Sequence, residues 1–164
     1  MKYELLQTDT MVYKGHTLKR IKRISDGALG GYIEYESNLS QHGTCWVDKG
    51  AKVYEDAHVD DNAQIQDKAR VLGNAIVEGN AIIMGNAVVH ARAEISGTVI
   101  VGDDSQVFGW AKVYGNARIL GCSDVSGDAR VYGCTVLRDS RVKGRADLNV
   151  DATLENLHIE HKGI

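Results

Sequence analysis

Histidine is the residue type in this sequence best suited to proton transfer near neutral pH, because the imidazole titrates in that range. The chain contains six of them: His16, His42, His58, His90, His158 and His161. A histidine held against a hydroxyl or an amine can act as the general base for transfer of an acyl group. His90 is the candidate catalytic residue, since it lies mid-chain beside the apolar residues Val88 and Val89. His58 is the second candidate base.

The cysteines and histidines are spaced unfavourably for a metal site. Zinc needs at least three converging protein ligands, which commonly come from closely spaced pairs. Cys45, Cys122 and Cys134 form no C-x-x-C pair, and His58 and His90 are far apart in the chain. The sequence therefore predicts no metal site. An odd number of cysteines also argues against a disulfide framework and favours a reducing, cytoplasmic compartment.

Aromatic and basic residues occur near one another along the chain, and such residues hold small anionic ligands by stacking and charge-assisted hydrogen bonds. The predicted ligand-binding residues are His90, Phe108, Tyr114, Arg118 and Tyr132. Further members of the same group are Tyr54, Arg70, Trp110, Lys112, Arg130 and Arg141. The alternative interpretation is a ladder of solvated side chains that stack only on one another.

A six-residue repeat determines where these side chains lie. A β-branched aliphatic residue recurs at every sixth position: Val47, Val53, Val59, Ile65, Val71, Val77, Ile83, Val89, Ile95, Val101, Val107, Val113, Ile119, Val125 and Val131. Two positions before most of them stands a small residue, usually alanine, as a sharp inward corner requires. Glycine follows two positions after many of them, which suits a turn with left-handed backbone angles. Strands this short, turned every six residues, predict an all-β solenoid.

The unit V-x-G-N-A-x resembles the hexapeptide repeat of left-handed parallel β-helices, in which three repeats make one triangular coil. The resemblance implies a left-handed parallel β-helix over residues 44–154, with about six coils. The series shifts by one residue after Leu137, because Val142 and Leu148 come one position early. Residues 155–164 are expected to form a C-terminal tail or lid over the last coil.

Residues 1–43 lack the repeat and are expected to form an N-terminal β cap. β-rich runs flank the Lys14-Gly15 dipeptide, which predicts a β-hairpin. Leu18, Ile21 and Ile24 supply apolar surface with which the hairpin would cover the first coil. The cap has too few apolar positions for an independent core, so we do not expect a separate domain.

Three runs connect the cap to the first coil. They are Leu29-Gly30-Gly31-Tyr32-Ile33-Glu34, Asn38-Leu39-Ser40-Gln41 and Gly43-Thr44-Cys45-Trp46-Val47. These runs resemble the entry segment of YdcK-like hexapeptide-repeat proteins. The resemblance implies a left-handed β-helix with a capping hairpin, a fold often described as transferase-like, and it implies no agreed substrate.

Positions eighteen residues apart share a face in a coil of three repeats, so outward side chains can be assigned to faces. Two adjoining faces carry apolar residues outward: Ile82, Met84, Ile100 and Leu120 on one, and Leu72, Val88 and Phe108 on the other. Exposed apolar residues gathered in this way indicate an interface. We expect a subunit contact there. The resemblance to left-handed β-helix proteins, which are usually trimers, implies a homotrimer.

The net charge excludes some partners. With 19 Lys and Arg against 22 Asp and Glu, the chain carries −3 and has no basic field for a nucleic-acid polymer or an anionic membrane. No run approaches the ~18 apolar residues of a transmembrane helix.

Three functions remain open at this point. The first is a non-catalytic oligomeric solenoid that binds a protein partner or a small anionic ligand on its faces or in intersubunit clefts, without a cofactor. The second is a hexapeptide-family acyltransferase that uses acyl-CoA and a histidine base. Against it, the repeat carries no inserted loop of the kind that commonly builds the acceptor pocket in that family. The third is an anti-defence protein, of the kind phages carry, that sequesters a signal nucleotide.

Overall fold

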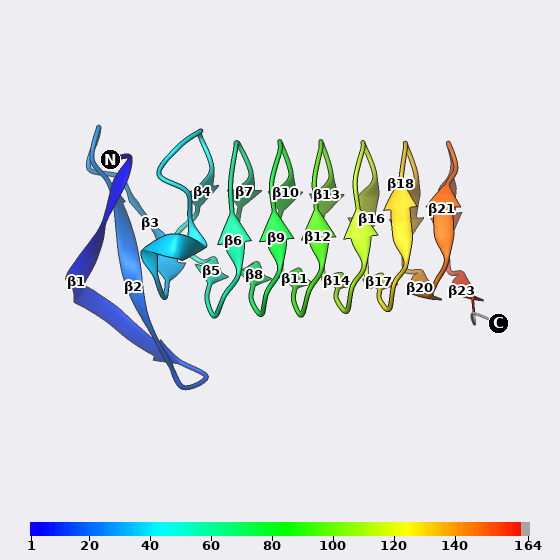
Figure 1. Cartoon of the computed structure of the whole chain (residues 1–164), viewed down its shortest axis with the longest axis horizontal. Helices are drawn as coiled ribbons and strands as arrows, with labels where there is room; N and C mark the ends of the chain where they lie inside the picture. The colour runs from blue at the N-terminus through cyan, green and yellow to red at the C-terminus, as the bar shows by residue number, and fades with distance from the viewer. Residues whose placement is uncertain (162–164) are drawn as a thin grey trace.

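The computed structural model describes residues 1–161, and it forms an all-β, left-handed parallel β-helix with about seven stacked coils. The coils follow one another in sequence order from the cap to the C-terminal end (Figure 1). Three sheets make the three sides, and we refer to them as sheets A, B and C.

Sheet A is the longest because it includes the cap. Its strands, in order, are β1 (Tyr3–Tyr13), β2 (His16–Arg23), β3 (Leu29–Ile33), β5 (Lys52–Val53), β8 (Arg70–Val71), β11 (Val88–Val89), β14 (Gln106–Val107), β17 (Asp124–Val125), β20 (Arg141–Gly144) and β23 (His158–His161). From β3 onward the pairing is parallel.

Sheets B and C consist only of solenoid strands. Sheet B contains β6 (His58–Val59), β9 (Ile76–Val77), β12 (Glu94–Ile95), β15 (Lys112–Val113), β18 (Arg130–Tyr132) and β21 (Asp147–Asn149). Sheet C contains β4 (Trp46–Val47), β7 (Gln64–Ile65), β10 (Ile82–Ile83), β13 (Ile100–Val101), β16 (Arg118–Leu120), β19 (Val136–Arg138) and β22 (Thr153–Glu155). One short 3-10 helix, η1 (Glu36–Asn38), links β3 to the first coil.

The predicted inward series forms the core. Each aliphatic residue from Val47 to Val131 is fully buried, and so are the corner alanines that precede them. The parallel register pairs Val89 with Val107 and then Val107 with Val125, as eighteen-residue stacking requires. After the phase shift, Val125 pairs with Val142 instead, which confirms that one corner is a residue shorter.

At most corners the chain turns through left-handed backbone angles at the position two residues after the inward aliphatic; Lys49, two residues after Val47, is an exception. Glycine fills many of these positions, as at Gly73, where φ is 72° and an added Cβ would lie 2.8 Å from the Ala91 nitrogen. Acidic residues take several others, and their carboxylates accept the backbone N–H one coil ahead, as Asp61 does from Gly79 at 3.0 Å. Ala91 also has a left-handed φ, of 60°, but it carries a Cβ, unlike glycine, and has no carboxylate to accept a hydrogen bond.

The expected hairpin forms the cap. β1 and β2 are antiparallel, with Lys14 and Gly15 at the tip, and β3 joins β2 to the parallel strand β5. The Tyr3 hydroxyl donates a hydrogen bond of 2.6 Å to the Leu39 carbonyl, which fixes the start of β1 against the first coil.

The apolar surface of the cap differs in part from the expectation. Leu18 and Ile21 are fully buried, but Ile24 is 51 % exposed, since it follows the end of β2. Gly30 allows the close approach of cap and coil, because a Cβ there would lie 2.6 Å from the Ile21 side chain and 2.7 Å from the Val47 carbonyl.

The C-terminal segment continues the sheets as far as the structure describes it. β22 pairs in parallel with β19, and β23 pairs in parallel with β20, so the solenoid has about seven coils instead of about six. Ile159 packs against the core, whereas Leu157 is exposed. Residues 162–164 of the expected tail lie outside the described residues. Within residues 1–161, no helix has the length and apolar character needed to cross a membrane.

Candidate functional site

A pocket lies between the tip of the β1–β2 hairpin and the outer surface of sheet A. Its volume is about 250 Å³, and it is lined by Lys14, Tyr54, Arg70, Leu72, Val88, His90 and Gln106. In Figure 1 the tip of the hairpin extends beyond the rest of the cap, toward the side of the first coils that carries β5 and β8. Apart from Lys14, every lining residue flanks an inward valine of sheet A and therefore points outward.

The hairpin is held over the solenoid by aromatic and cationic contacts. Arg70 donates a hydrogen bond of 3.1 Å from its guanidinium to the Tyr13 hydroxyl. The Tyr13 ring meets the Tyr54 ring edge-on with the centroids 5.9 Å apart, and the Lys52 ammonium lies 5.0 Å from the Tyr13 centroid. These contacts place Lys14 at the edge of the pocket.

Tyr54 is the buried polar group of the site. The residue is 1 % exposed, and its hydroxyl oxygen has no hydrogen-bond partner within the described part of the chain. Burial raises the pKa of this phenol, so the group is a neutral hydroxyl with one hydrogen to donate. A buried hydroxyl without a partner costs free energy, and such a group at a pocket wall favours a ligand that accepts its hydrogen bond.

His90 follows β11, one rung beyond Arg70 and one rung before Gln106. Its ring stacks on Phe108 with the centroids 5.0 Å apart and an interplanar angle of 8°. Burial lowers the pKa of His90, and Arg70 lowers it further against the opposing effect of Glu55. The imidazole is therefore neutral at pH 7 and presents one donor and one acceptor nitrogen.

The hairpin end of the pocket is cationic. Among residues 1–161, no carboxylate lies within ion-pair distance of Lys14, Lys52 or Arg70. The nearest acidic group, Glu55, accepts the Gly73 N–H at 2.7 Å. Its charge is thus already engaged.

A small network of titratable groups links the start of β2 to the first coil. His16 lies 3.1 Å from Glu34 and 3.5 Å from Glu55, and its ring is 5.2 Å from that of Tyr54. Burial acts to raise the pKa of Glu34, but hydrogen bonds from the Glu55 N–H and from His16 outweigh it and lower that pKa. Since these groups satisfy one another, we assign them a structural role.

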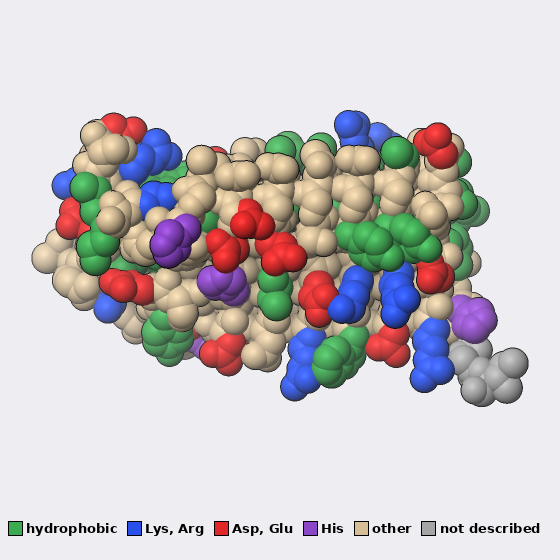
Figure 2. Space-filling model, turned by 45° about the horizontal axis from the view of Figure 1, so that its top comes forward, with side chains coloured by type: hydrophobic (Ala, Val, Ile, Leu, Met, Phe, Trp, Pro, Cys, Tyr) green, Lys and Arg blue, Asp and Glu red, His purple; other side chains and the backbone are tan. Residues whose placement is uncertain are grey.

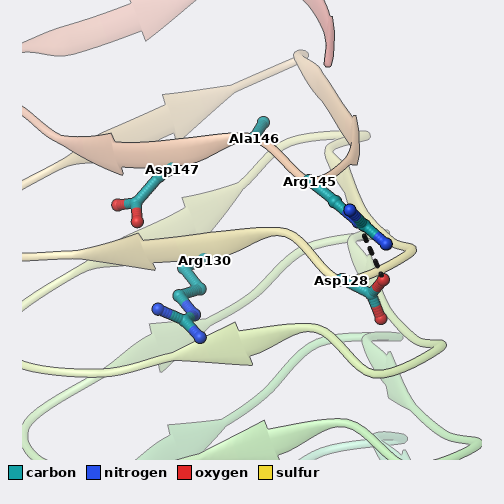
Figure 3. Close-up of a pocket in the computed structure, with 5 residues that line it drawn as sticks. All are labelled: Asp128, Arg130, Arg145, Ala146 and Asp147. Carbon is teal, nitrogen blue, oxygen red and sulfur yellow. Dashed lines mark ion pairs between the residues drawn. The ribbon is translucent and has the colours of Figure 1, made fainter. Parts of the chain in front are cut away.

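A second pocket of about 260 Å³ lies at the C-terminal end of the solenoid, lined by Asp128, Arg130, Arg145, Ala146 and Asp147. The Arg145 guanidinium points toward Asp128, 3.9 Å away, while Arg130 and Asp147 come from the paired strands β18 and β21 (Figure 3). Two carboxylates balance two guanidinium groups here, and no buried polar side chain faces the pocket among the residues described. This pocket is the weaker candidate.

The family model of the GMPPB C-terminal domain matches residues 41–150 of the chain. The chain belongs to this family. Its members have a hexapeptide-like left-handed β-helix, in agreement with the fold described above. No curated protein matches the sequence.

The match to the GMPPB C-terminal domain covers most of the solenoid but not the hairpin. Lys14 and Tyr13 therefore come from outside the region that the family model describes, while Arg70 and His90 come from inside it. The pocket is formed where the cap, which lies outside the matched residues, meets the solenoid of this family.

The predicted ligand-binding residues do not form one site. His90 and Phe108 stack on sheet A, and Tyr114 and Tyr132 stack on sheet B with the centroids 4.7 Å apart. Arg118 begins β16 on sheet C. Figure 2 shows apolar and aromatic side chains over the later coils next to Lys and Arg, with acidic side chains gathered over the earlier coils. Three separate faces therefore carry the five residues.

The sequence singled out Tyr54 and Arg70 only as members of a wider group, and it did not single out Lys14 or Gln106. The eighteen-residue rule could have predicted the position of Gln106, because Gln106 pairs in register with Val88, which pairs with Arg70. It could not have predicted the position of Lys14, since that position depends on where the hairpin docks.

The predicted interface residues lie on two sheets, as expected. Ile82 and Ile100 pair in register on sheet C, and Met84 and Leu120 close over Gly102 between them. Met84 is 37 % exposed. Leu72 and Val88 line the pocket on sheet A, with Phe108 under His90.

Proposed function

We propose that this chain is a non-catalytic oligomeric β-solenoid that binds a small anionic ligand in the pocket between the β1–β2 hairpin and sheet A. The observation that carries the proposal is the pairing of free cationic groups, Lys14 and Arg70, with the buried, unpartnered hydroxyl of Tyr54 at one end of one pocket. Charge-assisted hydrogen bonds from a guanidinium are about twice as strong as neutral ones. No cofactor is needed for this function.

The oligomer follows from the apolar residues of sheet C. Ile82, Met84, Ile100 and Leu120 are outward-facing and contiguous, and burying the exposed part of each would contribute at most roughly 1.5–3 kcal/mol. By analogy with other left-handed β-helices we propose a closed homotrimer, in which identical surfaces meet around a threefold axis. A protein partner is the alternative occupant of this surface.

Within the hexapeptide-repeat proteins, we propose that the chain is YdcK-like. The runs that carry this resemblance belong to the junction of cap and solenoid, where Gly30 permits close packing and the buried Asn38 donates to the carbonyls of Glu55 and Ala57. We further propose a cytoplasmic setting, which is supported by three free cysteines, two of them exposed.

An acyltransferase is the second candidate. It is favoured by one observation: His90, held neutral by burial, lies in a pocket together with a tyrosine hydroxyl. In that case acyl-CoA would bind and be consumed. Incubation with acetyl-CoA and a panel of amines and alcohols, followed by assay of free thiol, distinguishes the two functions, because a binding protein releases none.

Thermal unfolding in the presence of anions tests the binding function. We expect benzoate, inorganic phosphate or phenyl phosphate to raise the melting temperature at constant ionic strength, as ligands of the folded state do. Arg70→Gln and Lys14→Ala should each reduce the shift. Lys143→Ala, on the same sheet beyond the pocket, is the matched control. Equal shifts in all four proteins would contradict the proposal.

A further inference from the structure

The pocket under the hairpin has a defined length. The lining spans four successive rungs of sheet A, because Tyr54 follows β5 while Arg70, Val88 and Gln106 begin the next three strands in parallel register. Since neighbouring strands are 4.7–4.9 Å apart, the two outer rungs are separated by about 14 Å. The volume of about 250 Å³ corresponds to roughly eight water molecules at the density of the liquid. The volume is the tighter limit: a phosphate group and one six-membered ring fit within it, whereas a nucleotide adds a sugar and a second ring that would extend out of it.

The lining changes character along this length. At the hairpin end lie Lys14, Arg70 and the buried hydroxyl of Tyr54. The apolar side chains of Leu72 and Val88 come next, on the rungs of β8 and β11, with the neutral ring of His90 beside Val88, and the last rung supplies the amide of Gln106. A ligand that satisfies all three parts has an anionic head, an apolar body and a polar substituent.

The anionic head is better matched by a phosphate than by a carboxylate. Arg70 uses one guanidinium N–H for Tyr13 and retains others, Lys14 has three donors, and Tyr54 has one. These donors come from the hairpin, which carries Lys14, and from the two neighbouring coils that carry Tyr54 and Arg70. A tetrahedral dianion can accept hydrogen bonds from several directions, while a planar carboxylate accepts them near one plane.

The apolar body is set by Leu72 and Val88. Both are partly exposed on the outer surface of sheet A, Leu72 beside Arg70 on one rung and Val88 on the next rung toward Gln106. A flat hydrocarbon ring can cover both side chains, whereas inorganic phosphate would leave them in water.

We propose that the ligand of this pocket is a monocyclic organic phosphate, bound with its phosphate between Lys14 and Arg70 and its ring over Leu72 and Val88. This inference rests on the proposed function, since it specifies the chemistry of the same site. Phenyl phosphate is the simplest probe of that class. Benzoate has the ring without the phosphate, inorganic phosphate has the phosphate without the ring, and adenosine monophosphate exceeds the pocket volume.

Isothermal calorimetry on the full chain with these four probes tests the inference. We expect phenyl phosphate to bind at least about tenfold more tightly than each of the other three. Lys14→Ala should remove most of the preference over benzoate, and Leu72→Ala should remove most of the preference over inorganic phosphate. Lys14 is at an exposed hairpin tip, so its variant should keep the wild-type melting temperature. Lys143→Ala should keep both preferences.

The outcomes separate this inference from the proposed function. If benzoate or inorganic phosphate binds as tightly as phenyl phosphate, with dependence on Lys14, the pocket is an anion site and the organic-phosphate assignment is wrong. Tighter binding of adenosine monophosphate would overturn the argument from the pocket volume and favour a nucleotide ligand. If no probe binds, or if binding is unchanged by both pocket variants, the inference and the proposed function both fail.

Discussion

Arg70 and Tyr13 are 57 residues apart in the sequence, and a hydrogen bond of 3.1 Å joins them across the outer surface of sheet A. This contact ties the tip of the cap hairpin to the second rung of the solenoid. It also fixes Lys14, the next residue of the hairpin, at the edge of the pocket. The candidate site therefore depends on the docking of the cap as much as on the repeat.

Loss of this hydrogen bond should loosen the hairpin. Tyr13→Phe keeps the ring contacts with Tyr54 and Lys52 but removes the acceptor for Arg70. We expect a loss of about 0.5–1.5 kcal/mol in unfolding free energy and faster amide exchange in β1 and β2. Tyr114→Phe is the control, because no hydrogen bond of the Tyr114 hydroxyl is present among the described residues. Equal exchange in the hairpins of both variants would contradict this role of Tyr13.

Relief of backbone strain at one corner should stabilise the fold. Ala91 has φ of 60° although it has a side chain, and no carboxylate compensates as at the acidic corners. We expect Ala91→Gly to raise the unfolding free energy by about 0.5–1 kcal/mol, measured by urea denaturation. Ala93→Gly is the matched change at the next buried corner, where φ is not positive, and it should be destabilising. A loss of stability in both variants would argue against strain at Ala91.

Stability should depend on the ionisation of His90. Because burial holds the pKa of His90 below its unfolded value of 6.5, the unfolded chain binds a proton more readily than the folded one. The contribution of the neutral ring to the free energy of unfolding therefore has its full value above pH 6.5. It falls as the pH drops from 6.5 toward the lower pKa that His90 has in the folded chain. His90→Gln should reduce the fall in melting temperature between pH 7.5 and about pH 5. Parallel pH curves for both proteins would show that His90 does not titrate as inferred.

The apolar residues of sheet C should hold the oligomer together. Ile82 and Ile100 are neighbours in register, so the double change Ile82→Lys with Ile100→Lys places two charges side by side in the proposed contact. We expect folded monomers by multi-angle light scattering. Ile76→Lys on sheet B, where the isoleucine is also exposed, should leave the mass unchanged. If the double variant keeps the wild-type mass, the subunit contact lies elsewhere.

The repeat was predictable from the sequence because one physical rule governs it: a fixed six-residue period places one aliphatic residue of each repeat inside and assigns each outward residue to a face. The eighteen-residue rule thus brought His90 and Phe108 together correctly. It also shows why Tyr114 and Arg118 lie on other faces, although the predicted ligand set grouped them with His90. The acidic corners, such as Asp61 and Asp67, were not predicted, since their role depends on a backbone amide of the next coil.

The pocket itself was not predictable, because it depends on the direction in which the hairpin leaves the first coil. The sequence identified the turn at Lys14 and Gly15 but contained no sign that Tyr13 would meet Arg70 and Tyr54. Aromatic and cationic contacts of this kind are specific in three dimensions and leave no periodic pattern in the chain.

The location of a bound anion is the most direct test of the account. Titration of isotope-labelled protein with phenyl phosphate, followed by nuclear magnetic resonance, reports which backbone amides sense the ligand. We expect shifts at Lys14, Arg70, Val88 and Gln106 that saturate together and disappear in Arg70→Gln. Shifts confined to sheet B around Tyr114 and Tyr132, or to the pocket at Arg130 and Arg145, would contradict it.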